Sequence, residues 1–384
     1  MSTSSKIKNQ RGIIDRQAIL AQLEAVLAED LPKPKRRPKI LAIFKDALKT
    51  GHDEVRRRFE GHGQGTEAVR ENCFLVDQLV RLVHDYAVEH EYPTGVATAG
   101  QSMTIAAVGG YGRGELSPKS DIDLLFLLPY KRSSHAEQVV EYMLYMLWDM
   151  GLTVGHSTRS VDECIRQAKA DMTIRTALLE ARWLWGDQDL FEELRRRYRA
   201  DIVAGSMEEF VESKLAERDS RHEKLGEARY VLEPNIKEGK GGLRDLQTLY
   251  WIGKYLYHVD DAADLVDHAV FSRDEYKTFQ KAEAFLWDVR CQLHYVVGDE
   301  VERARDGAQS RGMDVDAFRL RHVEDADELD GVAAEGVGAR VEAAVLDEEV
   351  LGAAARLQES RQEARQARAC FPVLLLERGA EDAR

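Results

Sequence analysis

Apolar residues recur at helical spacing along the N-terminal part of the chain. Residues 15–31 place them three and four positions apart, and Pro32 is expected to end this helix. Two further helices are predicted near 40–61 and 66–90. The basic segment KPKRRPK at 33–39 is interrupted by two prolines, and we interpret it as a solvated connector in preference to a nucleic-acid patch.

The pattern changes after about residue 100. MTIAAVGG, DIDLLFLL and LTVGHSTR are short apolar runs typical of strands, and a helix over 134–151 separates the second run from the third. Helical spacing returns over 160–225, where Ser160 is the expected cap, and two further helices are predicted over 243–259 and 273–297. We therefore predict an α+β fold, with a small mixed β-sheet flanked by N-terminal and C-terminal helical regions.

Residues 303–384 differ in composition from the rest of the chain. They contain no Lys, Ile, Thr, Asn, Trp or Tyr, all of which the preceding part uses. One interpretation is an alanine-rich helical domain. We favour a frameshifted, disordered tail, because most of the missing residue types (Lys, Ile, Asn and Tyr) have A/T-rich codons, whose loss is expected in an out-of-frame reading of a G/C-rich gene. If a one-base shift near codon 303 opened no long frame, this interpretation would be wrong.

Charge and cysteine content narrow the class of protein. A net charge of −14 argues against general nucleic-acid binding, although a local cation would still allow one nucleotide to bind. No apolar run is long enough for a transmembrane helix, and the N-terminus lacks a secretory signal. The cysteines show no metal-ligand spacing and occupy positions Cys73, Cys164, Cys291 and Cys370. We expect a cytoplasmic protein with reduced thiols and no membrane partner.

The stretch GGYGRGELSPKSDIDLLFLLP at 109–129 carries the candidate chemistry. In an extended strand Asp121 and Asp123 point the same way, with Ile122 buried between them. Two converging carboxylates repel each other and form a hard-oxygen site suited to Mg²⁺, or to Mn²⁺ in its place. The alternative is a strand-turn-strand whose acidic edge has no function.

A glycine-rich turn precedes this acid pair. Gly109 and Gly110 lack a β-carbon, so a phosphate can approach their backbone closely. Arg113 and Ser120 are candidate side-chain donors to the same phosphate. A polyphosphate held by this turn and joined to the two acids through Mg²⁺ would balance their charge.

Gly-Gly followed eleven residues later by Asp-x-Asp resembles the signature of DNA polymerase β-like nucleotidyltransferases. This block, LWDMGLTVGHSTRSVDECI and LEPNIKEGKGGLRDLQTLYWI occur in order, and together they resemble the bacterial bifunctional uridylyltransferase/uridylyl-removing enzymes that modify the nitrogen-signalling protein PII. The resemblance covers roughly residues 10–302. With it, the predicted regions are helical 1–95, nucleotidyltransferase 96–205, helical and uridylyltransferase-associated 206–302, and the tail 303–384.

The resemblance implies a reaction in nitrogen-metabolism regulation: UTP and a tyrosine hydroxyl of PII give uridylyl-PII and pyrophosphate. Asp121 and Asp123 would hold one or two Mg²⁺ ions. Members of this superfamily often use a third carboxylate, but the strand LTVGHSTR contains none. His156, Asp171 and Glu180 remain open as additional site residues, and His156 is equally compatible with a scaffold role.

The loop KEGKGGLRD offers three cations beside a helix start. Lys237, Lys240 and Arg244 are candidates for contacting nucleotide phosphates or PII. A helix-capping loop with solvated lysines explains the same residues equally well.

Two other functions stay open. One is an adenylyltransferase or another nucleotidyltransferase of the same fold, and the other is an inactive, truncated product. The resemblance also implies a metal phosphohydrolase domain and two glutamine-sensing domains. The adjacent His and Asp at 82–86 and 266–270 lie in helical, apolar contexts, so we do not expect uridylyl removal or glutamine sensing in this chain.

Overall fold

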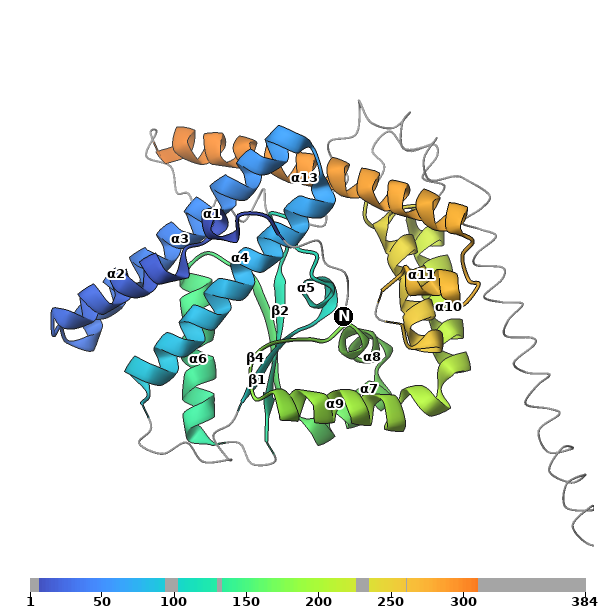
Figure 1. The fold of residues 1–384 in the computed structure, drawn as a ribbon, viewed down its shortest axis with the longest axis horizontal. Helices are drawn as coiled ribbons and strands as arrows, with labels where there is room; N and C mark the ends of the chain where they lie inside the picture. Colours follow the sequence, from blue (N-terminus) through green and yellow to red (C-terminus); the bar gives the residue numbers. More distant parts are fainter. Residues whose placement is uncertain (1–6, 94–102, 130–132, 226–234, 260, 310–384) are drawn as a thin grey trace, which may run out of the picture.

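The computed structural model describes residues 7–93, 103–129, 133–225, 235–259 and 261–309 (Figure 1). Most of the predicted tail at 303–384 lies outside the described residues. Its first seven residues continue a helix that begins well before them. None of the helices in the described ranges is long and apolar enough to cross a bilayer.

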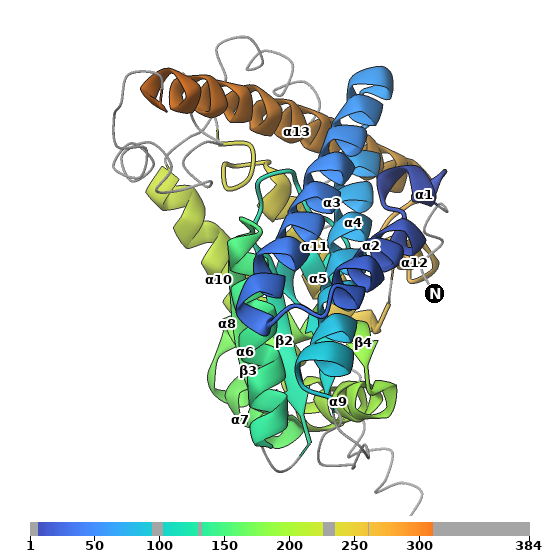
Figure 2. The same ribbon diagram turned by 90° about the vertical axis from the view of Figure 1, so that its left-hand side faces the viewer.

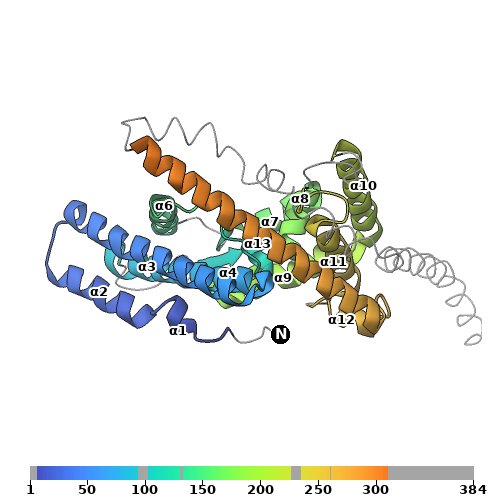
Figure 3. The same ribbon diagram turned by 90° about the horizontal axis from the view of Figure 1, so that it is seen from above.

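Helices α2, α3 and α4 pack side by side and form one layer (Figures 1 and 3). Their buried residues recur at helical spacing, as in the series Ile40, Phe44, Leu48, Val55 and Phe59 of α3. The elements are α1 (Gln10–Ile13), α2 (Arg16–Ala28), α3 (Lys33–His62), α4 (Gly65–Tyr86) and the π-helix η1 (Ala87–Glu91).

The basic segment 33–39 is not a connector, and that prediction was wrong. It forms the start of α3, with one proline in the first turn and Pro38 inside the helix. Proline fits the first turn because N–H groups there have no intrahelical partner, and Pro38 costs one hydrogen bond. Arg36 pairs with Glu91 at 2.9 Å and Arg37 with Asp149 at 2.6 Å, so these cations join helices.

A four-stranded mixed sheet lies beneath these helices, in the order β3-β2-β1-β4. The strands are β1 (Thr104–Ala107), β2 (Ile122–Leu128), β3 (Val154–Ser160) and β4 (Arg182–Gly186). β1 runs antiparallel to β2 and β4, whereas β2 and β3 are parallel and are joined through α6 (Ser134–Asp149). The predicted α+β class is confirmed. The uniform helical prediction over 160–225 was wrong at β4, which is only five residues long and lacks a clear alternation.

Alternation along β2 divides the core between the two sheet faces. Ile122, Leu124 and Phe126 pack in the cluster that contains the N-terminal helices and α6. Leu125 and Leu127 pack on the other face, against α7 (Val161–Ala170) and α9 (Gln188–Asp201). Asp123 has the parity of the second set, so its side chain leaves the sheet on the α7 side.

The C-terminal helices complete the second face and reach back over the first. They are α8 (Met172–Leu179), the short turn η3 (Val203–Gly205), α10 (Met207–Leu225), α11 (Leu243–Tyr257), α12 (Asp264–Asp267) and α13 (Arg273–Gln309). α13 crosses from α11 to α4 (Figures 2 and 3). The backbone N–H of Gly65 on α4 donates to Asp288 of α13 at 2.5 Å. The helices predicted at 134–151, 243–259 and 273–297 are present, and α13 extends through the predicted boundary at 302.

Candidate active site

The two acids of the motif lie where β2 begins. Asp121 directly precedes the strand, Asp123 is its second residue, and Ile122 between them is fully buried. The carbonyl of Asp123 accepts a hydrogen bond from the N–H of Val108 at 3.0 Å, and the N–H of Ile122 donates to Thr153 at 3.0 Å. Neighbouring strands therefore fix the backbone that carries the acids.

Two glycines flank the carboxylate of Asp123. The β2–β3 register places Gly155 directly opposite it, and a Cβ at Gly155 would lie 2.2 Å from Oδ1 of Asp123. A Cβ at Gly109 would lie 3.2 Å from Oδ2. Gly109 starts the short helix α5 (Gly109–Arg113) with a φ of 60°, which favours glycine. The structure thus brings the glycine turn and the acid pair together, although they are separated in the sequence.

The electrostatics of the pair match a site for a cation. Burial raises the pKa of Asp123 above its ordinary value, and the charge of Asp121 raises it further. Their repulsion would be relieved by a divalent cation, and carboxylate oxygens are the donors that Mg²⁺ prefers. The donor set of two neighbouring carboxylates fits such an ion. In the described part of the chain, no group of three or more His, Cys, Asp or Glu side chains is arranged to share a metal.

His156 lies on the opposite sheet face from Asp123. It is paired with Leu124, and its ring packs edge-on against Trp148 of α6 with the centroids 5.8 Å apart. Directly paired residues of neighbouring strands point to the same side, so His156 shares the α6 side. This placement fits the scaffold role.

The two candidate carboxylates for a third ligand have other contacts. Asp171 caps α8, accepting from the N–H groups of Thr173 at 2.7 Å and Ile174 at 3.0 Å. Glu180 is buried, and both of its oxygens accept from Arg113 Nη1 at 2.8 Å.

Arg113 and Ser120, the predicted phosphate donors, differ in their surroundings. The Arg113 side chain is 10% exposed and lies between Glu180 and Glu115, whose Oε2 lies 2.9 Å from its Nε. Ser120 is partly exposed beside Asp121, and its hydroxyl lies 2.5 Å from that of Ser117. Ser120 is thus better placed than Arg113 to contact a ligand.

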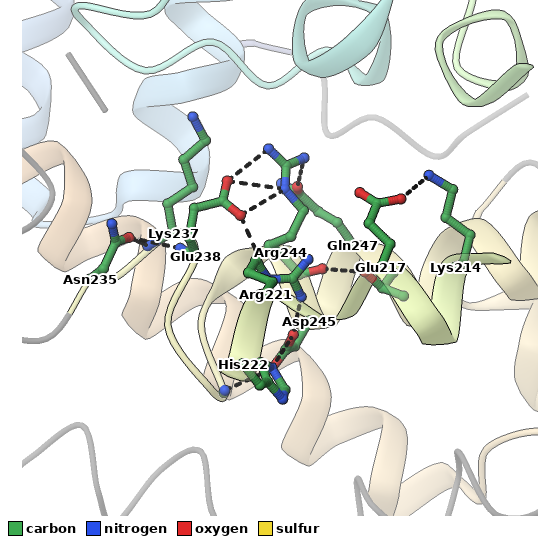
Figure 4. Close-up of polar contacts among 12 residues, drawn as sticks. Lys214, Glu217, Arg221, His222, Asn235, Lys237, Glu238, Arg244, Asp245 and Gln247 are labelled. Carbon is green, nitrogen blue, oxygen red and sulfur yellow. Dashed lines mark hydrogen bonds and ion pairs between the residues drawn. The ribbon is translucent and has the colours of Figure 1, made fainter. Parts of the chain in front are cut away.

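The loop before α11 is held by polar contacts (Figure 4). Arg244 pairs with Glu238 at 2.9 Å, and Asp245 accepts from His222 at 2.9 Å and from the N–H of Gly241 at 2.8 Å. Lys237 extends away from this network in Figure 4. Lys240 is exposed at the turn. The loop therefore has the capping contacts of the simpler interpretation, with Lys240 exposed and Lys237 partly exposed.

Gly155 and Trp251 were not singled out from the sequence. The signal for Gly155 is its position inside a strand, since such a glycine often marks close approach of another group. Trp251 follows the helical spacing of core residues, and nothing in that spacing marks its contact with Glu180.

Comparison with known proteins gives two family matches. Residues 94–184 match the nucleotidyltransferase domain family, and residues 209–311 match the GlnD PII-uridylyltransferase family. These segments correspond to the region around the acid pair and to the helices α10, α11 and α13.

Relatives named bifunctional uridylyltransferase/uridylyl-removing enzyme match most of the chain. The protein of Azospirillum brasilense is 57% identical over 300 residues, covering 78% of this chain and 32% of that relative. The protein of Rhodospirillum rubrum is 54% identical over 302 residues, with the same two coverages. That of Novosphingobium aromaticivorans is 50% identical over 292 residues, or 76% and 32%. These matches confirm the resemblance predicted from the sequence blocks. The chain spans about a third of the length of these curated relatives.

Proposed function

Because the chain contains a nucleotidyltransferase domain and is related over 78% of its length to bifunctional uridylyltransferase/uridylyl-removing enzymes, we propose that it is a protein uridylyltransferase. It transfers UMP from UTP to a tyrosine hydroxyl of PII and releases pyrophosphate. The observation that carries the proposal is that the glycine turn meets the acid pair, since Oδ2 of Asp123 lies 3.2 Å from where a Cβ of Gly109 would stand.

Asp121 and Asp123 would hold Mg²⁺, or Mn²⁺ in its place, which supplies positive charge to the α-phosphate and the leaving pyrophosphate. The chain's own residues orient the nucleotide. Gly109 and Gly110 have no β-carbon, so their backbone is proposed to accept the close approach of a phosphate, and the Ser120 hydroxyl to donate to it. Lys237 and Lys240 are proposed to attract the triphosphate or an acidic surface of PII.

In the transfer itself, a tyrosine oxygen forms a bond to the α-phosphorus while the bond from that phosphorus to the bridging oxygen of pyrophosphate breaks. The phenol has an ordinary pKa near 10, so loss of its proton needs assistance. Asp171 stays a candidate base by its exposure alone, since its hydrogen bonds to the N–H groups of Ile174 and Thr173 lower its pKa, whereas Glu180 is buried against Arg113. Arg113 is proposed to position the turn and not to bind phosphate itself.

The test is incubation of the 384-residue chain with PII, Mg²⁺ and either labelled UTP or labelled ATP. Labelling of PII from UTP, lost in the Asp121→Asn/Asp123→Asn variant, is the expected result. Labelling from ATP in preference to UTP would replace the proposal with an adenylyltransferase. A chain that unfolds cooperatively but neither binds UTP nor labels PII would be the inactive product.

A further inference from the structure

A buried tryptophan links the two segments that match different families. Trp251 of α11 is 4% exposed, and its indole N–H donates a hydrogen bond to Oε1 of Glu180. Glu180 follows α8, is 3% exposed, and accepts from Arg113 of α5 through both oxygens. The Arg113 guanidinium lies 5.9 Å from the centre of the Trp251 ring. The three side chains form a closed triangle that connects α5, α8 and α11.

The triangle ends on the glycine turn. α5 is five residues long and contains three glycines, so its own sequence gives it little rigidity. Arg113 is its last residue, and Gly109, which lies against Asp123, is its first. A Cβ on Gly112 would lie 2.3 Å from the carbonyl oxygen of Glu180, so α5 also packs directly on the backbone that carries Glu180. The orientation of the turn therefore depends on Glu180.

The triangle also contacts cations on the C-terminal helices α10 and α11. Lys214 of α10 and Arg244 of α11 lie 5.0 Å and 5.5 Å from the Trp251 ring centre. Arg244 in turn holds Glu238 of the loop before α11 (Figure 4). Cations over an indole face are attracted to it, more strongly where water is excluded. Trp251 thus lies beside both Arg244, which holds the loop before α11, and Arg113, which ends the glycine turn.

We propose that Trp251 is a positioning residue for nucleotidyl transfer, holding Glu180 and Arg113 so that the Gly109 turn keeps its place against Asp123. The inference rests on the proposed function. It adds a role for the helical segment that contains α10 and α11. This segment sets the geometry of the nucleotide site, in addition to any contact with PII. Without the indole N–H, Oε1 of Glu180 keeps its bond from Arg113 but loses its second donor, so the Glu180–Arg113 pair is held less firmly in place.

The test compares Trp251→Phe with Trp183→Phe. Both changes keep an aromatic ring and remove an indole N–H, but the N–H of Trp183 has no hydrogen-bond partner within the described residues. We measure kcat, the KM for UTP, the KM for PII, equilibrium binding of UTP with Mg²⁺, and thermal unfolding. Trp251→Phe is expected to lower kcat and to weaken UTP binding, each about tenfold, because misplaced reacting groups lose rate steeply. The KM for PII should not change, and Trp183→Phe should resemble wild type.

The informative result is a changed KM for UTP with an unchanged KM for PII. A role confined to stability would lower the unfolding temperature without changing one KM relative to the other. If Trp251→Phe loses its cooperative transition, Glu180→Gln takes its place and should show the same result. Equal UTP affinity and equal kcat in the Trp251 and Trp183 variants would overturn the positioning role. Failure of the wild-type chain to label PII would instead overturn the proposed function, and the UTP-binding comparison would still decide the role of Trp251.

Discussion

Replacing Gly155 with alanine is the sharpest available perturbation of the acid pair. The new methyl group would lie 2.2 Å from Oδ1 of Asp123, whereas Cβ atoms essentially never approach a heavy atom within 3.0 Å. The carboxylate must therefore move by about 1 Å or leave its rotamer, at a cost of about 0.5–1.5 kcal/mol.

This displacement acts on function more than on folding. The atom that the methyl group meets belongs to a side chain at the edge of the core, and alanine is tolerated in a strand at least as well as glycine. We expect the free energy of unfolding to fall by less than about 2 kcal/mol. With Asp123 in its proposed role of holding the metal, a 1 Å displacement of its oxygen should lower transfer about 100-fold.

The assay is transfer of labelled UMP to PII by wild type, Gly155→Ala and the control Gly205→Ala. Gly205 is exposed, and a Cβ there would meet nothing within 4 Å, so its variant should match wild type. The double variant Gly155→Ala/Asp123→Asn should be no less active than Asp123→Asn alone, because the alanine acts through that carboxylate.

If Gly155→Ala is folded and its activity stays within about twofold of wild type, the reasoning is refuted. A carboxylate that holds a metal ion does not tolerate such a displacement. Additive losses in the double variant would show that the alanine acts elsewhere.

Three further predictions test the site and the fold. Asp121→Asn/Asp123→Asn should lower transfer at least about 100-fold while unfolding at the same or a higher temperature, because both charges and their repulsion are removed; a marked drop in the unfolding temperature would contradict a metal-holding role. Burial lowers the pKa of His52 to about 4, from an ordinary value near 6.5. Between these two values the unfolded chain binds more protons than the folded chain, so the free energy of unfolding decreases as the pH is lowered. Urea unfolding at pH 7 and pH 4.5 should therefore show about 2–3 kcal/mol of loss that His52→Gln lacks, and equal losses in both proteins would be evidence against it. Gly65→Ala would place a Cβ 2.4 Å from the Trp287 backbone, and denaturant unfolding should show a loss of about 1–3 kcal/mol; an unchanged midpoint would mean that α4 and α13 do not pack as described.

Prediction from sequence succeeded where the signal is local. The alternation around Ile122 and the length of the following apolar run predicted a buried strand with Asp121 and Asp123 beside it, because side-chain parity in a strand depends only on neighbouring positions. The cap at Ser160 was likewise readable, and the structure contains the full capping box with Glu163.

Prediction from sequence failed where contacts with residues distant in sequence decide whether a helix or strand forms. The prolines of 33–39 predicted a connector, but Arg36 and Arg37 are paired with residues more than 50 positions away, which secures the start of the helix. The strand β4 is defined by its pairing with β1 and not by its own five residues.

The sequence by itself determined that a glycine turn and an acid pair occur at nucleotidyltransferase spacing within an α+β chain, because periodicity and spacing are properties of contiguous residues. Only the tertiary structure decided that Gly155 makes room for the Asp123 carboxylate, that His156 faces away from it, and that Arg113 is held by Glu180 and Trp251. Strand register and helix docking select these contacts, and both depend on burying surfaces from distant parts of the chain at the same time.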